Sequence, residues 1–267
     1  MRTRHLQPGL CLAILALPSD VLAAAWTLPA GQGQAIVTGT MSTSDQAFDG
    51  SSLIQPAPRY DKLELQGLVE YGVTDRLTAM VAPSLQHIDI ATPSAQRSGL
   101  GYTEFGGRYQ LLKGDAWVFS VQTTLRIPGT FDKSNPAAVG YTDPQVDVRG
   151  LLGYSFSAGS MPAFVDLELA QRFRLGGADD APSEIHADVT LGLRVTPRWL
   201  LLAQSFSVIS EGSGGPVFPS YDYHKLQLSA VYDVSEALSL QLGGFSTYAG
   251  RNAIQENGII TGAWFRF

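Results

Sequence analysis

Potential metal ligands recur at alternate positions in one short segment of the chain, Glu184-Ile-His-Ala-Asp188. Alternate residues of a β-strand lie about 6.6 Å apart, so one metal ion cannot easily reach all three side chains. A single histidine without a second convergent one is also weak evidence for a metal ligand set. We therefore expect no metal and no other cofactor here.

The same region brings arginine residues close to carboxylates. If consecutive strands form hairpins, Asp147 lies opposite Arg172, Arg174 lies near Glu184, and Arg172 lies near His186. One interpretation is a stabilising ladder of cross-strand pairs, worth about 0.2 to 1 kcal/mol each. The other is an electrostatic constriction whose arginine residues select anions or zwitterions. The candidate constriction comprises Asp147, Arg149, Arg172, Arg174, Glu184 and His186.

Hydrolytic chemistry would need a nucleophile and a base within hydrogen-bond reach of each other. Beyond residue 25 the histidines are His87, His186 and His224, and neither Ser84 nor Ser205 lies in a nucleophile motif. We therefore expect no enzyme, with an outer-membrane lipid hydrolase as the remaining catalytic alternative.

The N-terminus has the three parts of a secretory signal peptide. Arg2 and Arg4 precede an apolar stretch at residues 10–17, and Ala23-Ala24-Ala25 provides small residues for cleavage. The apolar stretch is too short to span a bilayer as a helix. We expect residues 1–25 to be the signal peptide. Its cleavage would remove Cys11, the only cysteine, and would leave residues 26–267 as one outer-membrane domain.

From Gly33 onward, segments of ten to thirteen residues alternate between apolar and polar side chains. Five short turn sequences alternate with six longer connections rich in Gly, Pro, Ser, Asn and Asp, which is typical of an outer-membrane barrel. A soluble β-sandwich or lipocalin-like barrel is the alternative. The expected strands are 33–43, 60–71, 77–88, 101–112, 117–128, 144–156, 163–174, 184–195, 200–210, 224–234, 238–248 and 257–267.

The two faces of these strands differ in chemistry. Trp117, Val121 and Leu125 share one side of the segment 117–128, and polar residues share the other. An apolar face toward lipid and a polar face toward a wet lumen explains both without burying unpaired charges. Aromatic residues near the short turns indicate an interfacial girdle: Tyr71, Trp117, Tyr154, Phe156, Trp199, Tyr232, Phe265 and Phe267.

The last segment is a strand with one apolar side, and it ends Phe265-Arg266-Phe267. It is similar to the C-terminal signature of Gram-negative outer-membrane β-barrels of the twelve-stranded channel type. The resemblance implies an all-β, twelve-stranded, antiparallel, up-and-down transmembrane β-barrel with both termini in the periplasm. It also implies the barrel assembly machinery and outer-membrane lipids as partners. The net charge of −6 without a polybasic surface gives no reason to expect nucleic acid binding.

Twelve strands spaced about 4.8 Å apart and tilted by about 40° form a backbone cylinder roughly 24 Å wide. Side chains then leave an opening of about 10 Å at most. The stretch from Ala25 to Gln34 resembles the start of phenol meta-pathway (MetA-type) outer-membrane proteins, which implies uptake of small, including aromatic, molecules. We therefore expect a channel for passive or facilitated passage of small polar or aromatic solutes; a structural or surface-interaction barrel is the alternative.

Overall fold

The computed structural model describes residues 24–129, 134–138, 143–176, 181–213 and 219–267. Within these ranges the chain is almost entirely antiparallel β-structure, and the only helical element is the short 3-10 helix η1, Pro136–Ala138. No helix in the described part of the chain is long and apolar enough to cross a membrane. The strands are β1 Gly33–Phe48, β2 Ile54–Thr74, β3 Leu77–Ala91, β4 Ser94–Lys113, β5 Trp117–Pro128, β6 Gln145–Ala158, β7 Met161–Arg174, β8 Glu184–Thr196, β9 Trp199–Ser210, β10 Asp222–Asp233, β11 Leu238–Arg251, β12 Ala253–Ile254 and β13 Asn257–Arg266.

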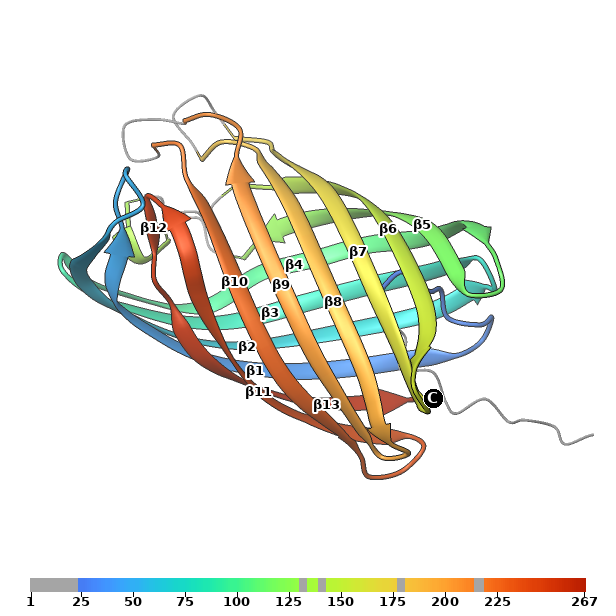
Figure 1. Ribbon diagram of the computed structural model, residues 1–267. Helices are drawn as coiled ribbons and strands as arrows, with labels where there is room; N and C mark the ends of the chain where they lie inside the picture. The colour runs from blue at the N-terminus through green and yellow to red at the C-terminus, as the bar shows by residue number, and fades with distance from the viewer. Residues whose placement is uncertain (1–23, 130–133, 139–142, 177–180, 214–218) are drawn as a thin grey trace, which may run out of the picture.

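The sheet closes on itself as an up-and-down barrel (Figure 1). Each long strand pairs with its sequence neighbours, and β1 pairs with both β2 and β13, so twelve strands form the wall. The additional strand β12 is two residues long and pairs only with Ala47 and Phe48 at the end of β1. Closure gives the last strand a partner and leaves no open edge, which confirms the expected twelve-stranded antiparallel barrel.

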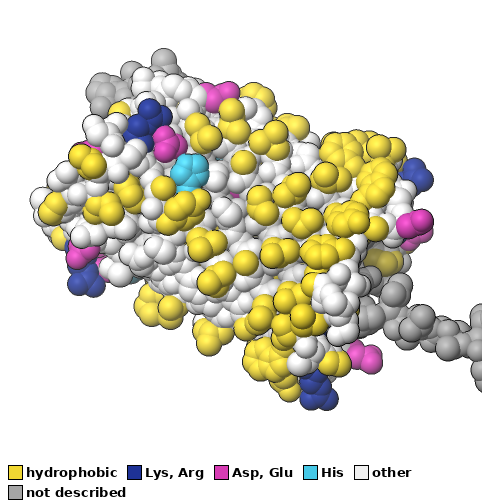
Figure 2. Space-filling model, viewed as in Figure 1, with side chains coloured by type: hydrophobic (Ala, Val, Ile, Leu, Met, Phe, Trp, Pro, Cys, Tyr) yellow, Lys and Arg dark blue, Asp and Glu magenta, His cyan; other side chains and the backbone are white. Residues whose placement is uncertain are grey.

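Side chains alternate between the outside and the inside of the wall. On β5, Trp117, Val121 and Leu125 are exposed, whereas Ser120 and Thr124 are buried. Hydrophobic side chains cover the middle of the face shown in Figure 2, and most of the charged side chains seen there lie toward the two ends. An apolar exterior around a polar interior is the arrangement of a barrel that faces lipid.

Aromatic side chains form the predicted girdle at the end of the barrel that carries the short turns, hereafter the turn side. Phe265 and Phe267 stack with ring centroids 6.1 Å apart. Trp199 and Tyr232 approach to 4.8 Å. Such amphipathic rings favour the boundary between lipid tails and water.

The opposite end, hereafter the loop side, differs from the expected arrangement of six long loops. Strand β1 continues to Phe48 and strand β2 begins at Ile54, so only residues 49–53 connect them. Strands β3 and β4 remain paired as far as Ala91 and Ser94. The sequence pattern predicts loops for the polar residues there, but ladder hydrogen bonds continue past the apolar band because polar side chains can face water on both sides of a strand. Parts of the three connections 129–144, 175–183 and 211–221 lie outside the described residues.

The predicted signal peptide lies almost entirely outside the described residues, which begin at Ala24. Ala24 and Ala25 themselves pack inside the barrel: Ala25 is fully buried with Val118 of β5 and Leu151 of β6. Figure 1 shows the first described residues and the C-terminus at the same end of the barrel, the turn side.

Candidate functional site: the barrel lumen

The turn-side end of the lumen is occupied by the N-terminal segment, residues 25–32. Ser120 donates a hydrogen bond to the carbonyl oxygen of Ala25 at 2.7 Å, and Arg108 donates to that of Trp26 at 2.8 Å. The Leu28 amide donates to the Thr78 hydroxyl at 2.8 Å. Bonds to β3, β4 and β5 therefore hold this segment across the interior of the barrel.

A buried ion pair between Arg108 and Glu70 contacts this segment. Arg108 Nη2 lies 2.7 Å from Glu70 Oε1, and both side chains are more than nine-tenths buried. Arg108 also donates to Gln122 at 3.1 Å, and Gln34 donates to the second carboxylate oxygen of Glu70. Hydrogen bonds to both members offset the cost of removing two charges from water, so this pair fixes the N-terminal segment through Trp26.

A cavity of about 320 Å³ lies between the N-terminal segment and the loop-side mouth. Part of its wall is apolar and aromatic, including Phe164 of β7 and Trp264 of β13, and part is made of amide and hydroxyl groups. Trp26 packs edge-on against Phe164 with ring centroids 6.4 Å apart, at the turn side of the cavity. We call this cavity the chamber; it is lined by Ala24, Ile36, Thr38, Gln66, Leu68, Arg149, Phe164, Glu168, Asp188, Thr190, Leu202, Gln204, Phe206, Gln227, Gln241, Ile260 and Trp264.

Glutamine side chains form short hydrogen-bonded rows along the chamber wall. Gln227 donates to Gln204 at 2.8 Å, and Gln204 donates to Thr190 at 3.2 Å. On the next strands, Trp264 Nε1 donates to Gln241 at 3.2 Å. Gln241 in turn donates to the Ser229 hydroxyl at 2.9 Å. Each of these amides has more donor and acceptor positions than these hydrogen bonds use, which leaves capacity for a polar solute.

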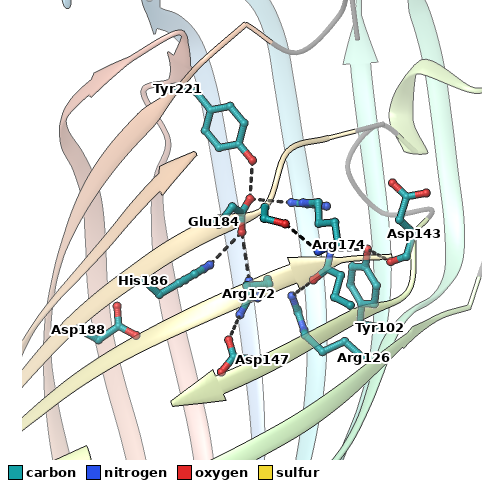
Figure 3. A network of polar contacts seen from close by, with 12 residues as sticks. Tyr102, Arg126, Asp143, Asp147, Arg172, Arg174, Glu184, His186, Asp188 and Tyr221 are labelled. Atoms are coloured by element: carbon teal, nitrogen blue, oxygen red, sulfur yellow. Dashed lines mark hydrogen bonds and ion pairs between the residues drawn. The ribbon is translucent and has the colours of Figure 1, made fainter. Parts of the chain in front are cut away.

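The loop-side mouth is crossed by a network of charges (Figure 3). Glu184 is its centre: its carboxylate accepts from Arg174 at 2.7 Å, from Tyr221 and from His186 Nε2 at 2.9 Å. Arg172 Nη1 lies 3.6 Å from the same carboxylate. The predicted pair of Arg174 with Glu184 is therefore present, and both side chains are more than nine-tenths buried.

The network continues down the wall toward the chamber. Arg172 Nη2 lies 3.2 Å from Asp147, and Arg149 lies 2.8 Å from Asp188 and 3.4 Å from Asp147. Arg149 also pairs with Glu168. We call these residues the charge ladder: Asp147, Arg149, Glu168, Arg172, Arg174, Glu184, His186 and Asp188. Its four carboxylates outnumber its three guanidinium groups, so its arginine residues do not make this mouth cationic.

One predicted contact has a different register. The β6–β7 hairpin places Asp147 opposite Arg172 as expected, but β8 places Glu184, not His186, opposite Arg172. His186 lies opposite Ala170, two residues from its expected partner. A slip of two residues keeps the same side chains in the lumen, so the composition of the predicted cluster is preserved while its pairing changes.

Sequence reasoning missed the side of the mouth formed by β4 and β5. Arg126 Nε lies 2.8 Å from Glu104, and its guanidinium stacks 4.5 Å from the centre of the Tyr102 ring. Gln145 accepts from Arg126 at 2.6 Å and donates to the Tyr102 hydroxyl at 2.8 Å. The sequence could have indicated this pair, because Glu104 and Arg126 lie directly opposite each other in the β4–β5 hairpin register.

The other two histidines of the described residues, His87 and His224, lie on the outer face of the wall. His87 Nδ1 is 2.6 Å from the Ser98 hydroxyl, and His224 Nδ1 is 2.8 Å from the Ser207 hydroxyl. Ser84 is instead buried and donates to the carbonyl oxygen of Tyr102. No group of three or more metal-ligating side chains occurs in the described ranges.

Comparison with known proteins gives one family and several solved structures with a similar barrel fold. The family model described as "Putative MetA-pathway of phenol degradation" matches residues 28–267. No curated protein matches the sequence. The COG4313 outer membrane channel from Pseudomonas putida F1 is similar in structure, with 15% identity, 92% of this chain and 99% of that chain covered, and a TM-score of 0.77.

Two further solved barrels are similar at lower scores. The NanC porin has 8% identity, covers 86% of this chain and 98% of its own, and has a TM-score of 0.52. The translocator domain of the autotransporter NalP from Neisseria meningitidis has 13% identity, 90% of both chains covered, and a TM-score of 0.50. At these identities the likeness establishes a shared barrel fold.

Proposed function

Because the chain belongs to the family described as "Putative MetA-pathway of phenol degradation", we propose that it is an outer-membrane channel for small solutes that combine an aromatic or apolar body with polar groups. It is not an enzyme in this proposal, and both termini face the periplasm. The similar barrel from Pseudomonas putida F1, whose name describes an outer membrane channel, supports this function.

The chamber is the observation that carries the proposal. A lumen intended only for ions and water has no need for Phe164, Leu202 and Trp264 to face it, because inward apolar side chains reduce the hydration of the path. Ring faces and apolar side chains lie beside amide groups that have unused hydrogen-bonding positions. This combination matches a planar solute with hydroxyl or carboxylate substituents. The volume of about 320 Å³ is at the lower end of small-molecule sites.

The charge ladder has a positioning role in this proposal. Each of its arginine residues is paired with at least one carboxylate, so the ladder narrows and orders the mouth without presenting a row of unpaired cations. This geometry favours the ladder interpretation of the six predicted constriction residues over selection of anions. Paired charges provide hydrogen-bonding groups along the path while leaving little net field.

Planar bilayer recordings test the function directly. The folded barrel is expected to conduct ions, and phenol or benzoate added to one side should interrupt the current while it occupies the chamber. Phe164→Leu should weaken this block by about two- to tenfold, since an aromatic contact contributes about 0.5 to 1.5 kcal/mol beyond its buried area. Phe173→Leu on the same strand is the matched control, because Phe173 faces outward and is exposed.

The alternatives give distinct results in the same recordings. Correctly folded protein that carries no current at either polarity would support a structural barrel. Current that is unaffected by phenol and benzoate would retain the channel and reject the aromatic solute class. Equal effects of Phe164→Leu and Phe173→Leu would show that the chamber does not hold the blocking molecule.

A further inference from the structure

Asp166 of β7 is a fully buried carboxylate in the lumen, beside the N-terminal segment. Its Oδ2 accepts a hydrogen bond from the backbone nitrogen of Ala25 at 2.7 Å. Its Oδ1 is buried and receives no hydrogen bond from any described residue. Unlike the carboxylates of the charge ladder, Asp166 forms no ion pair within the described part of the chain.

Such a group lacks a positive partner. A buried carboxylate is costly unless it is paired and hydrogen-bonded. The backbone amide of Ala25 can donate only one hydrogen, whereas an α-ammonium group at the same nitrogen has three hydrogens and a positive charge. An amino terminus at Ala25 would therefore supply both the missing charge and a donor for Oδ1.

The surrounding wall is shaped to receive this segment. A Cβ at Gly153, opposite Asp166 on the neighbouring strand, would overlap the ring of Trp26. A Cβ at Gly72 would overlap the carbonyl oxygens of Leu28 and Pro29. Two glycines thus make room for the residues that follow Ala25, and Ala25 itself fills a fully buried position.

We propose that the signal peptide is cleaved between Ala24 and Ala25, and that Asp166 binds the new α-ammonium group of Ala25 inside the lumen. Hydrolysis by a signal peptidase breaks the Ala24–Ala25 amide bond. Water supplies the oxygen that makes Ala24 a carboxylate, and the nitrogen of Ala25 gains protons to become ammonium. The ion pair then fastens the N-terminal segment across the turn-side mouth.

The proposal places cleavage one residue before the expected boundary at Ala25. Each residue of Ala23-Ala24-Ala25 is small enough to stand directly before the cleaved bond. Cleavage after Ala25 matches an A-x-A site at both small positions, whereas cleavage after Ala24 places the larger aliphatic Leu22 three residues before the bond. A chain that began at Trp26 would lose the buried Ala25 side chain and the carbonyl oxygen bound by Ser120. A chain that began at Ala24 would leave Asp166 facing a neutral amide.

Intact mass measurement and N-terminal sequencing of protein purified from outer membranes test the cleavage position. The expected first residue is Ala25. A first residue of Ala24, Trp26 or any other position would overturn the proposal. This measurement is independent of whether the lumen conducts solutes.

Acetylation with an N-hydroxysuccinimide ester tests the ion pair in the folded barrel. The α-amine of Ala25 should react at least about tenfold more slowly than the exposed Lys113, and at an ordinary rate after unfolding in urea. Asp166→Asn keeps the shape and an acceptor oxygen but removes the charge, so protection should fall about tenfold. Glu236→Gln, in an exposed turn-side position, should leave protection unchanged.

The outcomes separate pairing from burial. If Asp166→Asn folds and its α-amine remains protected, the ion pair is rejected. If that variant does not fold, the wild-type protein decides the question: an α-amine as reactive as Lys113 in the folded barrel would overturn the proposal, and protection together with an Ala25 start would support it.

Discussion

Gly33 and Phe267 exchange two backbone hydrogen bonds, from Gly33 N to Phe267 O at 2.7 Å and from Phe267 N to Gly33 O at 2.9 Å. This reciprocal pair joins the first residue of β1 to the last residue of the chain. A Cβ on Gly33 would overlap the ring of Phe267. The closing seam therefore places a residue without a side chain against a large aromatic ring.

Loss of the terminal aromatic residues should impair assembly. Deletion of Phe267, or replacement of Phe265 and Phe267 by Ser, removes exposed rings from the lipid face and, by resemblance, the assembly signal. The expected result is less folded barrel in the outer membrane, measured as heat-modifiable migration on a gel. Phe173→Ser, an outward change on β7, should reduce folding less. Normal yield of both terminal variants would contradict the prediction.

Replacement of Arg172 by Gln should destabilise the loop-side mouth. The change leaves Asp147 and Glu184 with one positive partner fewer each, and a hydrogen bond to a charged group contributes about 1.5 to 3 kcal/mol. Urea unfolding in lipid should report a loss of that order. The exposed Arg59→Gln on the loop side should change stability by less than about 0.5 kcal/mol. Similar losses for both variants would argue against a structural role for Arg172.

The same substitution should also change ion selectivity. Arg172→Gln adds one net negative charge to a ladder in which carboxylates already outnumber guanidinium groups, so the reversal potential should shift toward cations. Arg172→Glu should shift it further where the barrel still folds, because it places a third carboxylate between Asp147 and Glu184. The measurement belongs at low salt, where screening is weakest. Unchanged selectivity in folded protein would show that the ladder does not control the ion path.

The β1–β2 tip should loosen in acid. Backbone amides of Leu53 and Ser51 donate to the Asp49 carboxylate and hold its pKa below the usual 3.8. A lowered pKa in the folded state adds stability above pH 3.8, which is lost as the pH falls through the lower folded value. The protection factor of the Leu53 amide, which is the exchange rate of an unstructured peptide at the same pH divided by that of this amide, should therefore fall in strong acid. Asp49→Ala should show a low protection factor at every pH, and a pH-independent wild-type protection factor would contradict this.

The outward histidines should have no catalytic effect. On the outer face His224 is hydrogen-bonded to Ser207 and His87 to Ser98, so His224→Ala and His87→Ala each remove one pair that a lipid hydrolase could use as base and nucleophile. Phospholipid incubated with the folded barrel should release no fatty acid, with or without His87→Ala and His224→Ala. Release that disappears in either variant would support a lipid hydrolase.

Several features of the fold could be predicted from local pattern. A period of two residues places Val121 outside and Ser120 inside because side chains of a strand alternate between its faces. The same rule places Arg172 and Glu184 in the lumen but does not specify their exact partners. Turn residues predict the turn-side hairpins well. At the loop side the strand extensions are polar on both faces, so they lack the alternation of apolar and polar residues that would distinguish a strand from a loop.

Sequence alone determined the class of the protein: alternating strands, an apolar exterior, a charged interior and a terminal strand suited to closure. Tertiary structure decided the pairing of β7 with β8, the amide rows of the chamber and the contact between Ala25 and Asp166, which are 141 positions apart in the chain. The physical reason is that alternation specifies the face of each residue but not its height in the barrel. Height depends on loop length and on strand stagger, and an irregular segment such as residues 25–32 has no periodicity to reveal that it enters the lumen.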